Sequence, residues 1–268
     1  MTRREALCAL PLAARFARGF AVTDAAGPAL DRQFPALELN YLIVDARSRE
    51  VAASRWPDAT APVPVGSLVK PFLALAYGGA FPEFDCKGAA SSCWRAQGHG
   101  RLKFAAALAQ SCNAYFLNLA RHVDADTLRV TAAKFSLPPP SEQTPEARIG
   151  LGDGWRIAPL ALTRAYLELA ARRGEPHVDA ILAGLAMAAR NGTAKAIGAG
   201  TLAKTGTAEC VAARTGADAR NDSGDGFALA LDPAEAPRIA LLVRVHNVPG
   251  AEASKTAARM LKVLRGAA

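Results

Sequence analysis

The chain has 268 residues, a length typical of one large domain or two small ones. Hydrophobic residues make up 51% and charged residues 21% of the sequence, which excludes a disordered or collagen-like chain. The formal net charge of +8 favours anionic partners in general, but the basic residues are scattered and no nucleic-acid motif accompanies them, so we expect no nucleic-acid partner.

The first residues resemble an export signal. Arg3 and Arg4 precede the apolar run 6–14, and the small residues Gly19 and Ala21 offer a cleavage site. We interpret residues 1–21 as an export signal of the twin-arginine type, with a basic amphipathic first helix as the alternative. The prediction is an exported protein, periplasmic or extracytoplasmic in a bacterium. An apolar run this short is a poor membrane anchor.

The five cysteines are Cys8, Cys86, Cys93, Cys112 and Cys210. Removal of a signal would remove Cys8 and leave an even number, which suits an oxidising compartment. Cys86 and Cys93 lie in one predicted loop and could form a disulfide, although the pairing stays open. The C-x-x-C spacing of a zinc site is absent, and three of the four histidines, His122, His177 and His246, have no partner pattern. We therefore expect no metal and no cofactor.

The predicted elements describe one domain at 37–268, preceded by an irregular lead-in at 22–36. Residues 37–46 and 51–54 are rich in β-formers and predict a β-hairpin. Helices are expected at 67–77, 102–110, 113–123, 124–135, 159–173 and 178–190, and a long loop at 138–156. Strands at 201–209, 227–231 and 238–245 precede a final amphipathic helix at 251–264. This order predicts an α+β domain with a mainly antiparallel sheet from both chain ends and a large helical insertion.

Three short patterns carry the candidate chemistry. They are Ser67-Leu68-Val69-Lys70 at the start of a predicted helix, Ser111-Cys112-Asn113 between two helices, and Lys204-Thr205-Gly206-Thr207 on a predicted strand. Each pattern alone is a weak signal, but all three together, each in a suitable element, form a strong one.

The spacing of the first pattern explains how a serine could become a nucleophile. Residues three apart on a helix share a face, so Lys70 can reach the hydroxyl of Ser67. A neutral lysine can take that proton, and burial together with a second cation, Lys204, would lower the pKa of Lys70. Arginine cannot deprotonate, so lysine at these two positions is meaningful in a chain where Arg outnumbers Lys.

With these motifs, the sequence resembles the transpeptidase domain of penicillin-binding proteins, in the serine family that includes the β-lactamases. The resemblance covers about residues 37–266 and implies the β-lactamase/transpeptidase-like fold. YLIVDARSREVAAS is similar to the hairpin that opens such domains, and GSLVKPFLALAY to their nucleophile helix. Cys93-Trp94 with Gly98-His99-Gly100, followed by AAALAQSCNAYF, is similar to elongation-type members.

The resemblance implies a role for each residue of the three motifs. Ser67 would be the nucleophile, Lys70 its base and Ser111 a proton relay. Asn113 would bind the substrate amide, and the terminal carboxylate would be bound by Lys204, Thr205 and Gly206. The oxyanion hole would be formed by the N–H groups of Ser67 and Thr207. The implied function is acyl transfer on D-Ala-D-Ala stem peptides of peptidoglycan, as a D,D-transpeptidase or D,D-carboxypeptidase. Penicillin and other β-lactams would bind covalently, and cell-wall assembly proteins are expected partners.

Two alternatives remain open at this point. A serine β-lactamase would hydrolyse its acyl-enzyme quickly, but the glutamate of class A enzymes has no counterpart, since no Glu-x-x-x-Asn occurs between Asn113 and Lys204. A non-catalytic domain could be acylated and act as a sensor. His99 is interpreted as structural rather than catalytic.

Overall fold

The structure is a computed structural model that describes residues 26–35, 39–208 and 224–266. The predicted export signal at 1–21, Cys8 and Cys210 lie outside the described residues.

The strands are β1 (Leu39–Asp45), β2 (Val51–Ser54), β3 (Val63–Pro64), β4 (Phe84–Cys86), β5 (Gly100–Leu102), β6 (Arg156–Ile157), β7 (Leu202–Ala208), β8 (Asp225–Asp232) and β9 (Ile239–Val245). The α-helices are α1 (Ala26–Gln33), α2 (Lys70–Tyr77), α3 (Phe104–Ala109), α4 (Asn113–Ala120), α5 (Ala125–Ala133), α6 (Pro145–Arg148), α7 (Pro159–Ala171), α8 (Val178–Asn191) and α9 (Gly250–Gly266), and the 3₁₀ turns are η1 (Gly66–Val69) and η2 (Gly88–Ser91).

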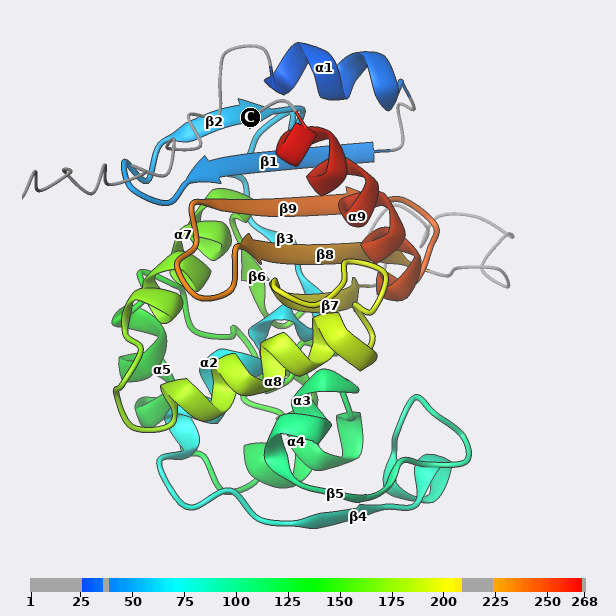
Figure 1. Cartoon of the computed structure of the whole chain (residues 1–268). Coiled ribbons are helices and arrows are strands. Elements are labelled where there is room, and N and C mark those ends of the chain that lie inside the picture. The colour runs from blue at the N-terminus through cyan, green and yellow to red at the C-terminus, as the bar shows by residue number, and fades with distance from the viewer. Residues whose placement is uncertain (1–25, 36–38, 209–223, 267–268) are drawn as a thin grey trace, which may run out of the picture.

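A five-stranded antiparallel sheet in the order β2-β1-β9-β8-β7 forms the centre of the fold (Figure 1). β1 and β2 are the predicted hairpin, whereas β7, β8 and β9 come from the other end of the chain. The two ends join where β1 pairs with β9. Helices α2 to α8 lie between β2 and β7 in sequence. The prediction of an α+β fold with a helical insertion is therefore confirmed.

Alternate residues of β1 enter different hydrophobic cores on the two faces of the sheet. Leu42 and Val44 pack with residues of the helical insertion, whereas Tyr41 and Ile43 pack with residues of α1 and α9. Figure 1 shows α9 across one face of the sheet and most helices of the insertion beyond the edge strand β7. Because successive side chains of a strand point to opposite faces, a strand covered on both faces is apolar nearly throughout.

Helix α1 corrects the expectation that residues 22–36 are irregular. Pro28 lies in the first turn of this helix, where its missing N–H group breaks no intrahelical hydrogen bond. Leu30 is fully buried in the core shared with α9. The hydroxyl of Tyr41 donates to the carboxylate of Asp31 at 2.9 Å. Tertiary packing thus stabilises a helix that the local sequence does not predict.

Two expected loops contain short regular segments. The loop at 138–156 includes α6, and the segment between α2 and α3 includes the antiparallel pair β4–β5. Asp124 is the N-cap of α5, because its carboxylate accepts a hydrogen bond from the backbone N–H of Thr127 at 2.8 Å.

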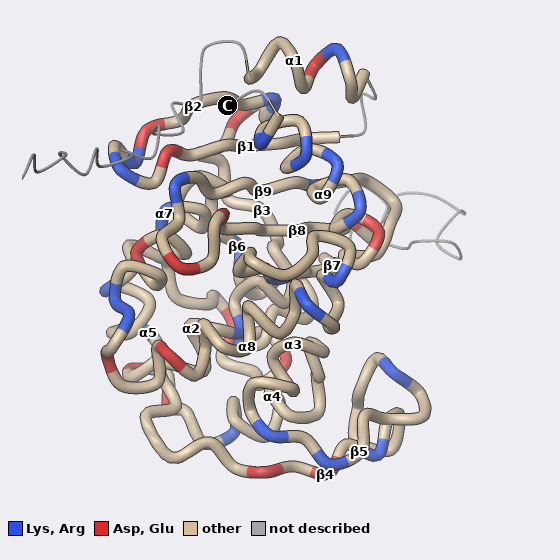
Figure 2. Tube along the Cα trace, in the orientation of Figure 1, with Lys and Arg blue, Asp and Glu red and all other residues tan. Residues whose placement is uncertain are grey.

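Charged residues are spread over the fold. Figure 2 shows Lys and Arg along both the sheet and the helical insertion, with Asp and Glu interspersed. This agrees with the scattered basic residues of the sequence. Among the described residues, no helix has the length and apolar character needed to cross a membrane.

Candidate active site

Ser67 lies in the 3₁₀ turn η1, which leads directly into α2. Side chains three residues apart in a 3₁₀ turn eclipse one another, so Lys70 lies on the same side as Ser67. Lys70 is fully buried. Pro71 occupies the first turn of α2, where a proline is tolerated. The hydroxyl of the buried Tyr166 donates to the carbonyl oxygen of Leu68 at 2.7 Å and anchors the turn.

Strand β7 lies against η1, and a glycine on each side permits the contact. A methyl group on Gly66, whose φ is +57°, would lie 2.4 Å from the carbonyl oxygen of Thr207. A methyl group on Gly206 would lie 2.6 Å from the carbonyl oxygen of Val65 and 3.3 Å from the nitrogen of Ser67. Only glycine allows backbones to approach so closely. The two segments expected to supply the oxyanion hole are therefore in contact.

Ser111 lies between the two lysines. Lys70 Nζ donates to the carbonyl oxygen and the hydroxyl of Ser111 at 3.0 and 3.4 Å, and to Asn113 Oδ1 at 2.7 Å. Lys204 Nζ donates to the hydroxyl of Ser111 at 2.8 Å and to the carbonyl oxygen of Thr205 at 2.6 Å. The φ of Ser111 is +50°, a conformation uncommon outside glycine, at the sharp break between α3 and α4.

Burial lowers the pKa of both lysines. It lowers the pKa of Lys70 to about 7, against the opposite influence of Cys112 and Cys93. The pKa of Lys204 lies well below its usual value because of burial and because the charge of Lys70 repels its own. Repulsion between two cations is reciprocal, so the pair does not keep both charges at neutral pH.

The structure brings the predicted site residues together around one cavity of about 260 Å³. The cavity is lined by Ser67, Ser111, Asn113, Thr205, Gly206 and Thr207. Lys70 and Lys204 lie behind this wall and reach it through the hydroxyl of Ser111. A larger cavity of about 530 Å³, beside Arg49 and Lys134, contains none of the predicted residues.

Two further polar groups in the cavity wall were missed by sequence reasoning. Trp94 is 57% exposed, and its indole Nε1 donates to the carbonyl oxygen of Ser111 at 3.2 Å. The hydroxyl of Thr193 accepts a hydrogen bond of 2.6 Å from the hydroxyl of Thr205. A tryptophan in a polar, glycine-containing loop could have indicated a role for Trp94 in the site. The sequence around Thr193 gave no such indication.

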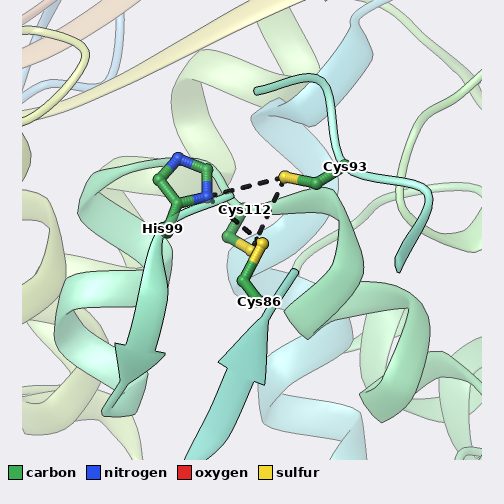
Figure 3. Close-up of side chains that lie close together, drawn as sticks. All are labelled: Cys86, Cys93, His99 and Cys112. Atoms are coloured by element: carbon green, nitrogen blue, oxygen red, sulfur yellow. Dashed lines mark hydrogen bonds between the residues drawn. The ribbon is translucent and has the colours of Figure 1, made fainter. Parts of the chain in front are cut away.

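Three cysteines and a histidine meet beside this wall, and we name Cys86, Cys93, His99 and Cys112 the cysteine–histidine cluster (Figure 3). Their ligand atoms all lie within 4.8 Å of one another. The three thiols are free and buried, so Cys86 and Cys93, whose pairing the sequence left open, do not form a disulfide. Thiolates and imidazole are the ligands that zinc prefers. The sequence spacing did not indicate this cluster, because its members come from four separated chain positions.

No model of a known protein family matches the sequence, and no curated protein matches it. Solved structures do match. The chain is similar to the penicillin-binding protein PBP2 of Helicobacter pylori, solved in complex with MreC, at 15% identity and a TM-score of 0.74, over 91% of this chain and 63% of that chain. It therefore spans less than two thirds of that protein.

Two other solved structures are similar over most of their length. One is the D,D-transpeptidase domain of a peptidoglycan glycosyltransferase from Eggerthella lenta, at 16% identity and a TM-score of 0.73, over 90% of this chain and 81% of that chain. The other is penicillin-binding protein A of M. tuberculosis in a ceftriaxone acyl-enzyme complex, at 17% identity and a TM-score of 0.68, over 92% of this chain and 78% of that chain. The chain has the transpeptidase fold of penicillin-binding proteins, as the sequence resemblance implied.

Proposed function

We propose that this chain is a serine acyl-transfer enzyme that acts on D-Ala-D-Ala stem peptides of peptidoglycan, as a D,D-transpeptidase or D,D-carboxypeptidase. Penicillins would acylate it at Ser67. The observation that carries the proposal is the shared cavity of Ser67, Ser111 and Asn113, backed by a buried Lys70 with a pKa of about 7. A lysine that is neutral near pH 7 can take the proton of a serine nucleophile.

Substrate binding would prepare the base. The terminal carboxylate of the stem peptide binds at Thr205, in front of the buried Lys204, and its negative charge favours the protonated form of Lys204. The charge on Lys204 then repels a proton from Lys70. Because the hydroxyl of Ser111 accepts hydrogen bonds from both lysines, it offers the path for that proton. The arrival of substrate thus makes Lys70 neutral.

The chemical step follows from this charge arrangement. Ser67 Oγ attacks the carbonyl carbon of the penultimate D-alanine while Lys70 takes its proton. The N–H groups of Ser67 and Thr207 stabilise the oxyanion. When the tetrahedral intermediate collapses, the peptide C–N bond breaks, the leaving nitrogen takes the proton and D-alanine departs. An amine or water then attacks the ester carbonyl and releases Ser67.

One observation favours this function over a serine β-lactamase. Among the described residues, no acidic side chain lines the cavity. A carboxylate is the group that class A enzymes use to activate the deacylating water. We therefore expect the penicilloyl ester to be long-lived. A sensor that is acylated without turnover shares this expectation and differs only in releasing no D-alanine.

The compartment and partners follow from the same proposal. Peptidoglycan stem peptides and β-lactams meet such an enzyme outside the cytoplasm, which agrees with the export signal proposed at 1–21. Cell-wall assembly proteins are proposed partners, since the similar H. pylori protein was solved in complex with MreC.

Incubation with a fluorescent penicillin and, separately, with a D-Ala-D-Ala peptide tests the function. We expect stable label on Ser67, located by mass spectrometry, and release of D-alanine. Ser67→Ala should lose both, whereas Ser48→Ala, at an exposed hairpin turn, should keep both. Rapid loss of label would support a lactamase, and stable label without D-alanine would support a sensor. A wild-type chain that takes no label would refute the acyl-enzyme.

A further inference from the structure

We propose that the cysteine–histidine cluster binds one Zn²⁺ ion and that this ion holds the cavity wall formed by Trp94, Ser111 and Asn113 in place. The first part stands on the cluster alone. The second part rests on the proposed function, because it concerns the wall that faces Ser67.

The spacing of the ligand atoms suits a tetrahedral zinc ion. With Zn–S near 2.3 Å and Zn–N near 2.0–2.1 Å, tetrahedral geometry separates two sulfurs by about 3.8 Å and a sulfur from a nitrogen by about 3.6 Å. In the cluster, Cys93 Sγ and Cys112 Sγ are 3.8 Å apart, and His99 Nδ1 lies 3.5 Å from both Cys86 Sγ and Cys93 Sγ. A disulfide would need about 2.05 Å. The observed separations match shared coordination rather than a covalent pair.

The loop that carries three of the ligands is folded around them by its own backbone. The N–H of Cys93 donates to the carbonyl oxygen of Gly88 at 3.0 Å, and the N–H of His99 donates to that of Cys86 at 3.2 Å. Gly88 and Gly98 have φ values of +68° and +78°, and a methyl group on Gly98 would lie 2.2 Å from the carbonyl oxygen of Cys86. The ligands are therefore held in position before any ion binds.

The side chains of the cluster have few other partners. Nε2 of His99 is buried and has no hydrogen-bond partner within the described residues, whereas Nδ1 faces the sulfurs (Figure 3). Soft thiolates select zinc over magnesium or calcium.

The cluster is continuous with the cavity wall at two places. Cys112 directly follows Ser111 in the sequence, and Cys93 directly precedes Trp94. Trp94 donates to the carbonyl oxygen of Ser111 at 3.2 Å, and its ring meets the ring of His99 edge-on at 5.4 Å between centroids. An ion bound by both cysteines would tie these two wall segments together.

Metal analysis of the full chain, purified from zinc-supplemented cells, tests the first part. We expect one zinc per chain, and replacement by Co²⁺ should give thiolate-to-metal charge-transfer absorption. His99→Ala and Cys112→Ser should weaken zinc retention at least tenfold, whereas His122→Ala, an exposed histidine, should not. A wild-type chain without zinc, or one in which mass spectrometry finds Cys93 and Cys112 joined in a disulfide, would overturn the proposal.

A second measurement tests the wall without relying on catalysis. The emission of Trp94, taken as the difference from Trp94→Phe, should shift when a chelator removes zinc and return when zinc is restored. The rate of penicillin acylation should fall about tenfold or more in parallel and recover with zinc. Zinc removal that leaves the emission unchanged would overturn the role of the ion in the wall. If the zinc-loaded chain takes no penicillin, the proposed function fails, while metal content and emission still decide this inference.

Discussion

Lys204 donates a hydrogen bond of 2.8 Å to the hydroxyl of Ser111, although 93 residues separate the two in the sequence. Lys70 reaches the same oxygen atom at 3.4 Å from another part of the chain. Three distant segments therefore meet at a single hydroxyl, and the charge on one buried lysine is linked to the charge on the other.

The rate of penicillin acylation should rise as the pH passes through about 7. Burial lowers the pKa of Lys70 to about that value, so the lysine is protonated below it and free to accept the proton of Ser67 above it. Stopped-flow acylation between about pH 5 and about pH 9 measures this profile. A rate that does not change with pH would contradict the assignment of Lys70 as the base.

The same pKa predicts how stability depends on pH. The pKa of Lys70 is lower in the folded chain than its model value of 10.5, which represents the unfolded chain. Between the two values the unfolded state binds more protons, so the contribution of Lys70 to stability rises with pH across this window. It is lost as the pH falls through the window and does not change further below about 7. Urea unfolding of the wild type and Lys70→Met across this window should show a steeper rise of stability with pH in the wild type, because the lowered pKa of Lys204 contributes in both chains.

Lys70→Arg should reduce acylation by about 10²–10⁴-fold, the usual contribution of a general base. Arginine preserves the positive charge but cannot deprotonate in a protein. Lys103→Arg, at an exposed position, is the matched control and should acylate normally. Retained acylation in Lys70→Arg, at an unchanged melting temperature, would show that another group takes the proton.

Gly66→Ala should destabilise the chain more than Gly198→Ala and should also slow acylation. Both glycines have positive φ, so each substitution strains the backbone by about 1–2 kcal/mol. Only at Gly66 would the added methyl group also meet backbone, 2.4 Å from the carbonyl oxygen of Thr207; nothing lies within 4 Å at Gly198. Thermal unfolding compares the two variants, and equal losses would argue against a tight contact between η1 and β7.

Tyr166→Phe should lower the free energy of unfolding by about 1–3 kcal/mol, because it removes the hydroxyl that pairs with the buried carbonyl oxygen of Leu68. Tyr77→Phe is the control, since within the described residues the hydroxyl of Tyr77 makes no hydrogen bond. Tyr166→Phe should also acylate more slowly, because Leu68 directly follows the nucleophile. If both variants unfold alike in urea, the hydrogen bond does not anchor η1.

Local patterns predicted most of the regular elements. The apolar runs of β1, β8 and β9 reflect strands that are covered on both faces, and the N-cap at Asp124 is a contact within one helical turn. Helix α1 escaped prediction because its eight residues have little helical signal and owe their conformation to burial of Leu30 and to the contact of Asp31 with Tyr41. The export signal at 1–21 stays a prediction.

The sequence by itself determined which residues could react. Ser67 and Lys70 are three apart, and helical geometry alone sets that relationship. Only the tertiary structure decided that Ser111 and Lys204 share a hydrogen bond and that Cys86, Cys93 and Cys112 gather around His99. Contacts of this kind depend on how the helical insertion packs against β7 and on the path of the β4–β5 loop. Packing is a property of the whole chain, and no spacing within one segment encodes it.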